Sequence, residues 1–266
     1  MGHFDDDTAI TRGGDHWVGE VSNRWLIGSN PNGGYLLAMV ARAMLADSRH
    51  PDPWTVTAHY MSPPAVGPVE IRTSVIKPGR TYATVSGELH QQGRERVRVL
   101  GAFGDLSARR GPSRVVATMP DVPPPDDCMP RDERVAPGAP LAPEVTRRFD
   151  VRVPPDAPWG RHPGDAPFEV TGWIRFADGT EPSALGLLLL ADAFPPTVIG
   201  GIDVGWVPTI ELTTHVRARP APGWVLGTFR TRFLIDGMME EDGELWDSEG
   251  RLVALSRQLA MALPRG

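Results

Sequence analysis

The sequence predicts an α+β protein of two similar units, each a helix wrapped by a curved antiparallel sheet. Two observations lead to this prediction. A strand-like run, a helical segment and four further strand-like runs follow one another early in the chain, and the same order returns near its end. A helix and a sheet each need to bury an apolar side, and packing one on the other satisfies both. Two unrelated α+β domains are the alternative to a repeat.

The first unit, residues 1–106, begins with the alternating run DHWVGEVS. A helix is predicted over 30–47, NPNGGYLLAMVARAMLAD, because its apolar residues recur at helical spacing on one stripe. Four strand-like runs follow, WTVTAHYM, VEIRTSVI, YATVSGELH and RVRVLGAF, and QQGR predicts the turn between the last two.

Residues 107–167 carry half of the prolines of the chain, in less than a quarter of its length. Proline removes a backbone donor and fixes φ, so this segment suits neither a central strand nor a helix interior. We expect a long linker with a short helical or strand piece near Glu144–Val151. A structureless loop of this length inside one domain is unusual, which favours two units.

The second unit, residues 168–266, opens with the strand-like run FEVTGWIRF. A helix is predicted over 181–194, EPSALGLLLLADAF, and it must be buried on most sides because it is apolar nearly all round. The strand-like runs VPTIELTTHVR, WVLGTFRTRFL, GELWD and LVALSRQLAMAL follow, with DSEGR as the final hairpin turn.

Charge and composition limit the partners of the protein. The net charge of −6 disfavours nucleic acid and anionic membranes, since both attract basic surfaces. The single cysteine, Cys128, cannot form an internal disulfide, and the acidic start MGHFDDDTAI lacks the features of a signal peptide. We therefore expect a cytoplasmic protein without a membrane span.

Asp192 is the first candidate for a catalytic group. It directly follows the apolar run LLLLA, and a carboxylate at the end of a buried helix is costly unless it is hydrogen-bonded or functional. Burial and the negative end of its own helix would both raise its pKa toward that of a useful general base. Exit into solvent at Pro195-Pro196 is the alternative.

Two polar residues on strands near that helix end are candidate partners. Gln258 lies among Leu255, Leu259 and Met261, so its amide needs partners if it is buried. Thr209 opens the run TIELTTH, where strand propensity alone would also explain a threonine.

Other chemistries find little support. The sequence contains no G-x-S-x-G elbow, no phosphate-binding loop and no G-x-G-x-x-G fingerprint. Its seven histidines show no metal-ligand spacing, and one cysteine cannot complete a zinc site. We expect no metal and no cofactor.

The chain resembles double-hotdog acyl-CoA thioesterases over nearly its whole length apart from the proline-rich segment. NPNGGYLLAMVARAM is similar to the glycine-pair opening of the family's hotdog helix. LLLADA, PTIELTTHVRARPAPGWVL and LWDSEGRLVALSRQLA resemble its A-S-D, T-(I/L)-D-H and D-G-x-L-V-A-S-x-x-Q segments. The resemblance implies a double hotdog fold, two tandem hotdog units that hydrolyse a fatty or related acyl-CoA.

By position, the catalytic trio of the family falls on Asp192, Thr209 and Gln258. Two departures stand beside this match: Glu211 and Leu212 replace the Asp-His pair, and the glycine expected soon after Gln258 is absent. The helix of the first unit carries no acid between Gly33 and Ala46, so we expect the N-terminal hotdog to be non-catalytic and the C-terminal hotdog to carry the catalysis.

In the implied mechanism the trio holds a water, with Asp192 as general base. The backbone N–H groups at Gly33 and Gly34 are candidate oxyanion donors. Candidates for substrate contact are Gly33, Gly34, Tyr35, Met39, Arg80, Phe194, Trp206 and Arg257.

A non-catalytic acyl-CoA or acyl-carrier binding protein with a decayed site is the main alternative. A hotdog hydratase is less favoured, because the first histidine after Asp192 is His215. A homodimer or larger homo-oligomer is expected from the resemblance.

Overall fold

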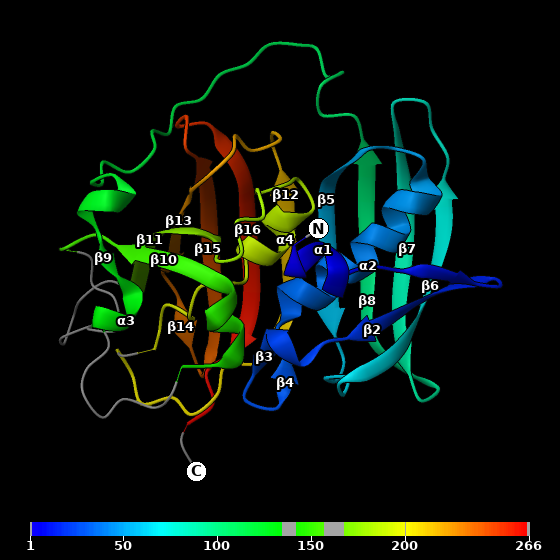
Figure 1. Cartoon of the computed structure of the whole chain (residues 1–266), viewed down its shortest axis with the longest axis horizontal. Helices are drawn as coiled ribbons and strands as arrows, with labels where there is room; N and C mark the ends of the chain where they lie inside the picture. Colours follow the sequence, from blue (N-terminus) through cyan, green and yellow to red (C-terminus); the bar gives the residue numbers. More distant parts are fainter. Residues whose placement is uncertain (1, 135–141, 157–167, 200, 265–266) are drawn as a thin grey trace.

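The computed structural model describes residues 2–134, 142–156, 168–199 and 201–264 and contains both expected helix-and-sheet units (Figure 1). In the first unit, helix α2 (Gly33–Ser48) packs against strands in the order β1-β2-β6-β7-β8-β5. These strands are β1 (Thr11–Gly13), β2 (His16–Val21), β5 (Asp52–Tyr60), β6 (Gly67–Lys77), β7 (Tyr82–Gln91) and β8 (Arg94–Gly104). Short elements precede α2, namely α1 (His3–Asp7), η1 (Asn23–Trp25), β3 (Leu26–Ile27) and β4 (Asn30–Pro31).

The second unit repeats this arrangement around the short helix α4 (Gly186–Leu190), with strand order β12-β16-β15-β13-β11-β10-β9. Its strands are β9 (Met129–Pro130), β10 (Phe149–Val153), β11 (Phe168–Phe176), β12 (Thr209–Val216), β13 (Val225–Thr231), β14 (Leu234–Ile235), β15 (Met238–Asp247) and β16 (Leu252–Met261). Its other helical pieces are η2 (Pro125–Asp127), α3 (Arg131–Arg134) and η3 (Glu144–Arg148). The predicted α+β architecture of two tandem units is confirmed.

The two units share one sheet of 14 strands, because β5 of the first pairs antiparallel with β12 of the second. Ala58 lies opposite Leu212 in this ladder, and the hydroxyls of Thr57 and Thr213 hydrogen-bond across it at 2.8 Å. The seam between the units therefore lies inside the sheet, and side chains from both can meet beside it.

Helix α2 begins at Gly33, three residues into the predicted segment 30–47, whose first two residues form β4. Asn32 is its N-cap, with a side chain that accepts the backbone N–H of Tyr35 at 2.8 Å. Arg49 ends the helix in the left-handed conformation, at φ 61°. Nearly every residue from Gly34 to Met44 is buried, so the helix forms the core of the first unit.

Helix α4 is much shorter than the predicted helix over 181–194. It spans only Gly186–Leu190, after which the chain turns toward Pro195-Pro196. Proline cannot continue a helix and keeps the preceding residue out of the helical region, which stops α4 early. Its four leucines are fully buried, as expected, and α4 packs against the start of α2.

The proline-rich segment is more than a linker. Helix η3 and strand β10 stand at the piece expected near Glu144–Val151, and β10 pairs with β11 and β9 to extend the second sheet. Residues 105–124 form no helix or strand. They reach the second sheet, where the indole N–H of Trp173 donates to the carbonyl of Pro123 at 2.9 Å. Parts of the predicted linker, 135–141 and 157–167, lie outside the described residues.

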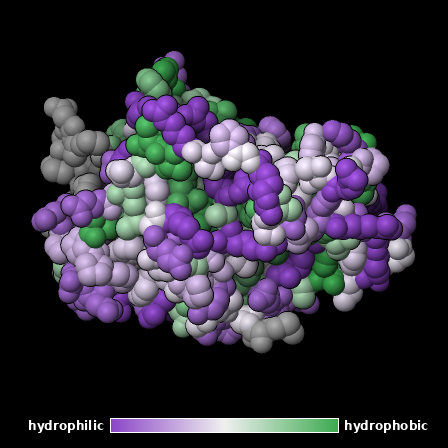
Figure 2. All heavy atoms as spheres, turned by 90° about the horizontal axis from the view of Figure 1, so that it is seen from above, coloured by the Kyte–Doolittle hydropathy of each residue, from purple (hydrophilic) through white to green (hydrophobic). Residues whose placement is uncertain are grey.

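Both predicted hairpin turns are present. Gln92 and Gly93, with φ of 54° and 74°, join β7 to β8 as in a two-residue hairpin loop, and Gly250 sits at φ 75° between β15 and β16. Strand β15 begins at Met238, five residues before the run GELWD. On the face drawn in Figure 2, hydrophilic side chains alternate with small hydrophobic groups. Within the described ranges, no helix is both long and apolar enough to cross a membrane.

Candidate active site

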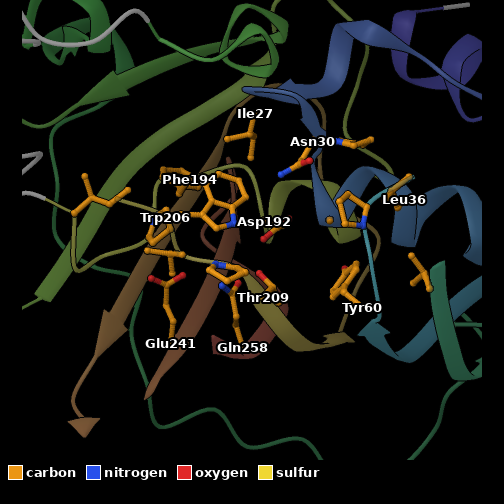
Figure 3. Close-up of a pocket in the computed structure, with 18 of the residues that line it drawn as sticks. Ile27, Asn30, Leu36, Tyr60, Asp192, Phe194, Trp206, Thr209, Glu241 and Gln258 are labelled. Atoms are coloured by element: carbon orange, nitrogen blue, oxygen red, sulfur yellow. The ribbon is translucent and has the colours of Figure 1, made fainter. Parts of the chain in front are cut away.

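A cavity of about 300 Å³ opens at the seam between the two units (Figure 3). The first unit lines it with the start of α2, the β3–β4 hairpin and the end of β5, and the second with residues after α4 and with β12, β15 and β16. Asp192, Thr209 and Gln258 all line this cavity, so the structure brings the three sequence-predicted catalytic residues together.

The carboxylate of Asp192 is held by the first unit. Its Oδ2 accepts the backbone N–H of Gly34 at 2.7 Å and the side-chain amide of Asn32 at 3.0 Å. The same amide donates to the backbone carbonyl of Asp192 at 2.8 Å. Asp192 is thus fixed at the N-terminus of α2, in the other half of the chain.

Burial raises the pKa of Asp192 to about 6, even though hydrogen bonds from Gly34, Asn32 and Gly33 act in the opposite direction. Asp192 lies just beyond the C-terminus of α4, as predicted, but its carboxylate also lies at the N-terminus of α2, where the helix dipole stabilises an anion. Burial is the main cause of the raised pKa.

The predicted oxyanion role of Gly34 needs correction. Its N–H is donated to Asp192 and is therefore not free for a substrate oxygen. The glycine is needed for close packing instead: a Cβ at Gly34 would lie 2.7 Å from the Cβ of Asp192 and 2.9 Å from the carbonyl oxygen of Leu188. Gly33 lines the cavity, and its N–H also hydrogen-bonds to Asp192, so its contact with substrate stays a prediction.

Sequence reasoning missed Asn32. It is buried, and both polar atoms of its side-chain amide are hydrogen-bonded. The oxygen accepts the backbone N–H of Tyr35 and so caps α2, and the nitrogen donates to the carboxylate of Asp192. The signal was an asparagine directly before the glycine pair, at the N-cap of the predicted helix. The N-terminal unit, expected only to support, thus supplies direct partners of the candidate base.

Thr209 and Gln258 face the cavity from neighbouring strands. Thr209 opens β12 at a β-bulge, and Gln258 is buried on β16, opposite Leu212. Gln258 is 6% exposed and belongs to the cavity wall. Glu211 and Leu212, the two departures from the family pattern, do not line the cavity.

Glu241 is a second buried acid that the sequence did not reveal. It lies on β15 opposite Gln258 and lines the same cavity. Its carboxylate accepts the backbone N–H of Thr197 at 2.7 Å, which ties the chain after Pro196 to the cavity wall. Burial raises the pKa of Glu241 to about 7, and the nearby charge of Asp192 adds to this effect. The expected strand GELWD did not reach Glu241, whereas β15 begins at Met238 and includes it.

The predicted substrate contacts divide into two groups. Trp206 and Phe194 line the cavity. Tyr35 and Met39 do not: both are fully buried in the core, and the hydroxyl of Tyr35 donates to backbone carbonyls of Asp7 and Glu20.

The predicted basic contacts also miss the cavity. Arg80 is exposed in the turn between β6 and β7, two residues before Tyr82. Tyr82 and Asp52 both pair with Gly104, so Arg80 lies near the first residue of β5. The cavity lies at the last residue of this nine-residue strand, roughly 25–30 Å away. Arg257 is engaged with Asp242 at 2.6 and 2.7 Å.

A cluster outside the cavity was not foreseen from histidine spacing. Side-chain ligand atoms of Glu88, His90 and Glu95 lie within 4.8 Å of one another. Arg98 pairs with Glu95 at 2.6 Å and with Glu88 at 3.0 Å, so a protein cation already neutralises these carboxylates. The cluster gives no basis for a metal site.

Two family models match the chain in tandem. Residues 21–104 match the acyl-CoA thioesterase N-terminal domain, and residues 125–262 match the C-terminal domain. The chain belongs to the acyl-CoA thioesterase family. Within this family assignment, the second domain begins well inside the proline-rich segment, in agreement with the pairing of β9 and β10.

Solved structures of thioesterase II type and of hotdog fold are similar to this acyl-CoA thioesterase family member. A candidate thioesterase II from Thermobifida fusca YX is 35% identical, covers 98% of this chain and 97% of its own, and superposes with a TM-score of 0.88. A hot dog fold protein of unknown function from Alicyclobacillus acidocaldarius is 24% identical, with full coverage of both chains and a TM-score of 0.88. The fold is therefore a tandem hotdog, as predicted.

A further relative has no assigned activity. An uncharacterised protein of Mycobacterium tuberculosis is 29% identical over 265 residues, which cover 91% of this chain and 89% of the relative. The family and the thioesterase II neighbour support thioester hydrolysis.

Proposed function

We propose that the protein is an acyl-CoA thioesterase that hydrolyses a fatty or related acyl-CoA to the free acid and CoA. The observation that carries this proposal is the position of Asp192. It is a half-buried carboxylate with a pKa of about 6, and it lines a largely apolar cavity together with Thr209 and Gln258. A group with this pKa is ionised at neutral pH and is basic enough to accept a proton from water.

In the proposed reaction, one water lies between Asp192, Thr209 and Gln258. The hydrogen bonds from Asn32 and Gly34 both end on Oδ2 of Asp192, and we assign to Oδ1 the contact with this water. Asp192 takes the water proton while the water oxygen bonds to the thioester carbonyl carbon. The tetrahedral intermediate then collapses with cleavage of the carbon–sulfur bond, and the CoA thiolate leaves and takes up the proton from Asp192. Thr209 and Gln258 contribute by orienting the water.

The acyl chain would occupy the apolar part of the cavity, lined by Ile27, Leu36, Phe194, Val204 and Trp206. Burial of a methylene group there contributes about 0.8 kcal/mol to binding. This gives the cavity an affinity for the acyl group that does not depend on charge.

The anionic part of CoA would need a cation near the cavity mouth. Arg96 is the basic residue that the structure offers: its Nη1 donates to the hydroxyl of Ser62 at 2.9 Å, and Ser62 lines the cavity. Its buried Nε has no hydrogen-bond partner among the described residues. We assign to Arg96 the role that the sequence suggested for Arg80 and Arg257.

The proposal is tested by incubating the protein with acyl-CoA substrates of increasing chain length and measuring the release of free thiol. Turnover of at least one member is expected. Binding of acyl-CoA without turnover of any member would instead favour the non-catalytic binding protein. A homo-oligomer and a cytoplasmic location stay predictions, the first of which sedimentation of the purified protein tests.

A further inference from the structure

Tyr60 places an unused hydroxyl at the candidate active site. The residue ends β5 and lines the cavity from the side of the first unit, opposite Trp206 and Phe194 (Figure 3). Its hydroxyl oxygen is buried and has no hydrogen-bond partner among the described residues. Leaving a buried donor unsatisfied is unfavourable, so such a group at a ligand cavity indicates a partner supplied by the ligand.

The hydroxyl lies close to the candidate base. A Cβ built on Gly33 would be 3.1 Å from the Tyr60 hydroxyl oxygen and 3.1 Å from Oδ2 of Asp192. Because both oxygens are this close to one point, they are at most about 6 Å apart. A carbonyl group can fit between them. Its oxygen can accept a hydrogen bond of about 2.7–2.8 Å from the Tyr60 hydroxyl, while its carbon faces a water bound to Asp192.

The proposed reaction lacks an oxyanion donor that Tyr60 can provide. The carbonyl oxygen becomes negatively charged in the tetrahedral intermediate and needs fixed donors. The N–H groups of Gly33 and Gly34, which the sequence suggested for this role, both hydrogen-bond to Asp192. Tyr60 offers a donor beside Asp192 whose hydroxyl has no hydrogen-bond partner among the described residues.

We propose that Tyr60 is a catalytic residue that donates its O–H to the carbonyl oxygen of the bound thioester and stabilises the oxyanion. This inference rests on the proposed thioesterase function. Tyr60 keeps its proton throughout, while the water proton passes to Asp192 and then to the departing thiolate. Burial, together with the charges of Asp192 and Glu211, raises the pKa of Tyr60 well above its ordinary value, which keeps the phenol a donor over the whole working range of pH.

Tyr35 provides a matched control. It is another buried tyrosine of the first unit, but its hydroxyl donates to Asp7 and Glu20 carbonyls and accepts the N–H of Ser22. Loss of that hydroxyl leaves backbone groups unpaired and lowers stability. Loss of the Tyr60 hydroxyl leaves no protein group unpaired, so Tyr60→Phe is expected to melt at the same temperature as the wild type or higher.

The experiment compares wild type, Tyr60→Phe and Tyr35→Phe in hydrolysis and in binding. Tyr60→Phe is expected to lower kcat by about 10²-fold with KM changed less than threefold, as for removal of one oxyanion donor. Binding is measured with two unreactive CoA analogues of equal chain length. One is a ketone in which a methylene replaces the sulfur, and the other is an alkyl thioether without a carbonyl.

Wild type and Tyr35→Phe should prefer the ketone, and Tyr60→Phe should lose most of that preference. Hydrolysis by Tyr60→Phe at the wild-type rate, with the ketone preference intact, would overturn the inference and leave the proposed function standing. A wild type that hydrolyses no acyl-CoA would contradict the proposed function. In that case the analogue preference still decides whether Tyr60 contacts the carbonyl.

Discussion

The carboxylate of Asp192 accepts the backbone N–H of Gly34 at 2.7 Å, across the boundary between the two halves of the chain. The candidate base thus belongs to one hotdog unit and its direct partners to the other. Neither half could form this site alone, because Asn32 and Gly34 fix the carboxylate whose neighbours Thr209 and Gln258 lie in the second unit. Four predictions that follow from this arrangement are directly testable.

Asn32→Ser should shift the pH dependence of activity. Serine still caps α2, but it removes the amide donor that stabilises the charged form of Asp192. A hydrogen bond to a charged group is worth about 1.5–3 kcal/mol, so the pKa of Asp192 should rise from about 6 by about one to two units. The acid limb of the kcat/KM profile should move to higher pH by the same amount. An unmoved limb would show that Asn32 does not tune the base.

Asp192→Asn should make the fold more stable at neutral pH. The ordinary pKa of 3.8 rises to about 6 in the folded protein, so the folded state binds more protons between these values. The free energy of unfolding therefore falls as the pH rises through this window, and the penalty remains above it. Asparagine cannot ionise, so the free energy of unfolding of Asp192→Asn should exceed that of the wild type by up to about 3 kcal/mol above pH 6. Below pH 4 the two proteins should differ little. Denaturant unfolding at the two pH values checks this, and an equal gain at both would contradict it.

Gly34→Ala should damage both stability and activity. The added Cβ would collide with Asp192 and with the Leu188 carbonyl, and overpacking of this kind costs about 1–3 kcal/mol. Gly186→Ala, at the start of α4, is the matched control, because its Cβ would come no closer than 3.3 Å to the Ser183 hydroxyl. Thermal melts should separate the two variants. Equal stability would mean that α2 and α4 can move apart without loss.

Arg96→Met should weaken CoA recognition without slowing the chemistry. Loss of a charge-assisted contact to a phosphate is worth about 1.5–3 kcal/mol, which predicts a rise in KM of at least about tenfold with kcat within a factor of about two. Arg80 lies between β6 and β7, near the end of β5 that is far from the cavity, and Arg80→Met should leave both KM and kcat unchanged. A larger effect at Arg80 would place the CoA site elsewhere.

Local sequence pattern predicted most of the fold. The strands from Asp52 to Gly104 alternate buried and exposed residues, and Asn32 followed by two glycines marks the start of α2. The length of α4 could not be predicted, because LLLLADAF continues a helical pattern that Pro195 and the contact with Gly34 cut short. A short piece was expected near Glu144–Val151, but the prolines around it gave no sign that β10 extends the second sheet.

The site was predictable only in part. Asp192 and Gln258 are conspicuous because each is polar among apolar residues, whereas strand propensity also explains Thr209, and all three line one cavity. Asn32, Tyr60 and Glu241 were not conspicuous, because each has an ordinary local explanation as a cap, a strand residue or a solvated acid. Their place at the site depends on the pairing of β5 with β12 and of β15 with β16, which no local pattern specifies.

The most direct test of the central claim is the rate of acyl-CoA hydrolysis by wild type and Asp192→Asn, with acyl-CoA binding measured on the same samples. If Asp192 is the general base, the wild type hydrolyses at least one acyl-CoA, and Asp192→Asn loses about 10²-fold or more in kcat while it still binds. Equal kcat values for the two proteins would contradict the assignment of Asp192 as the base.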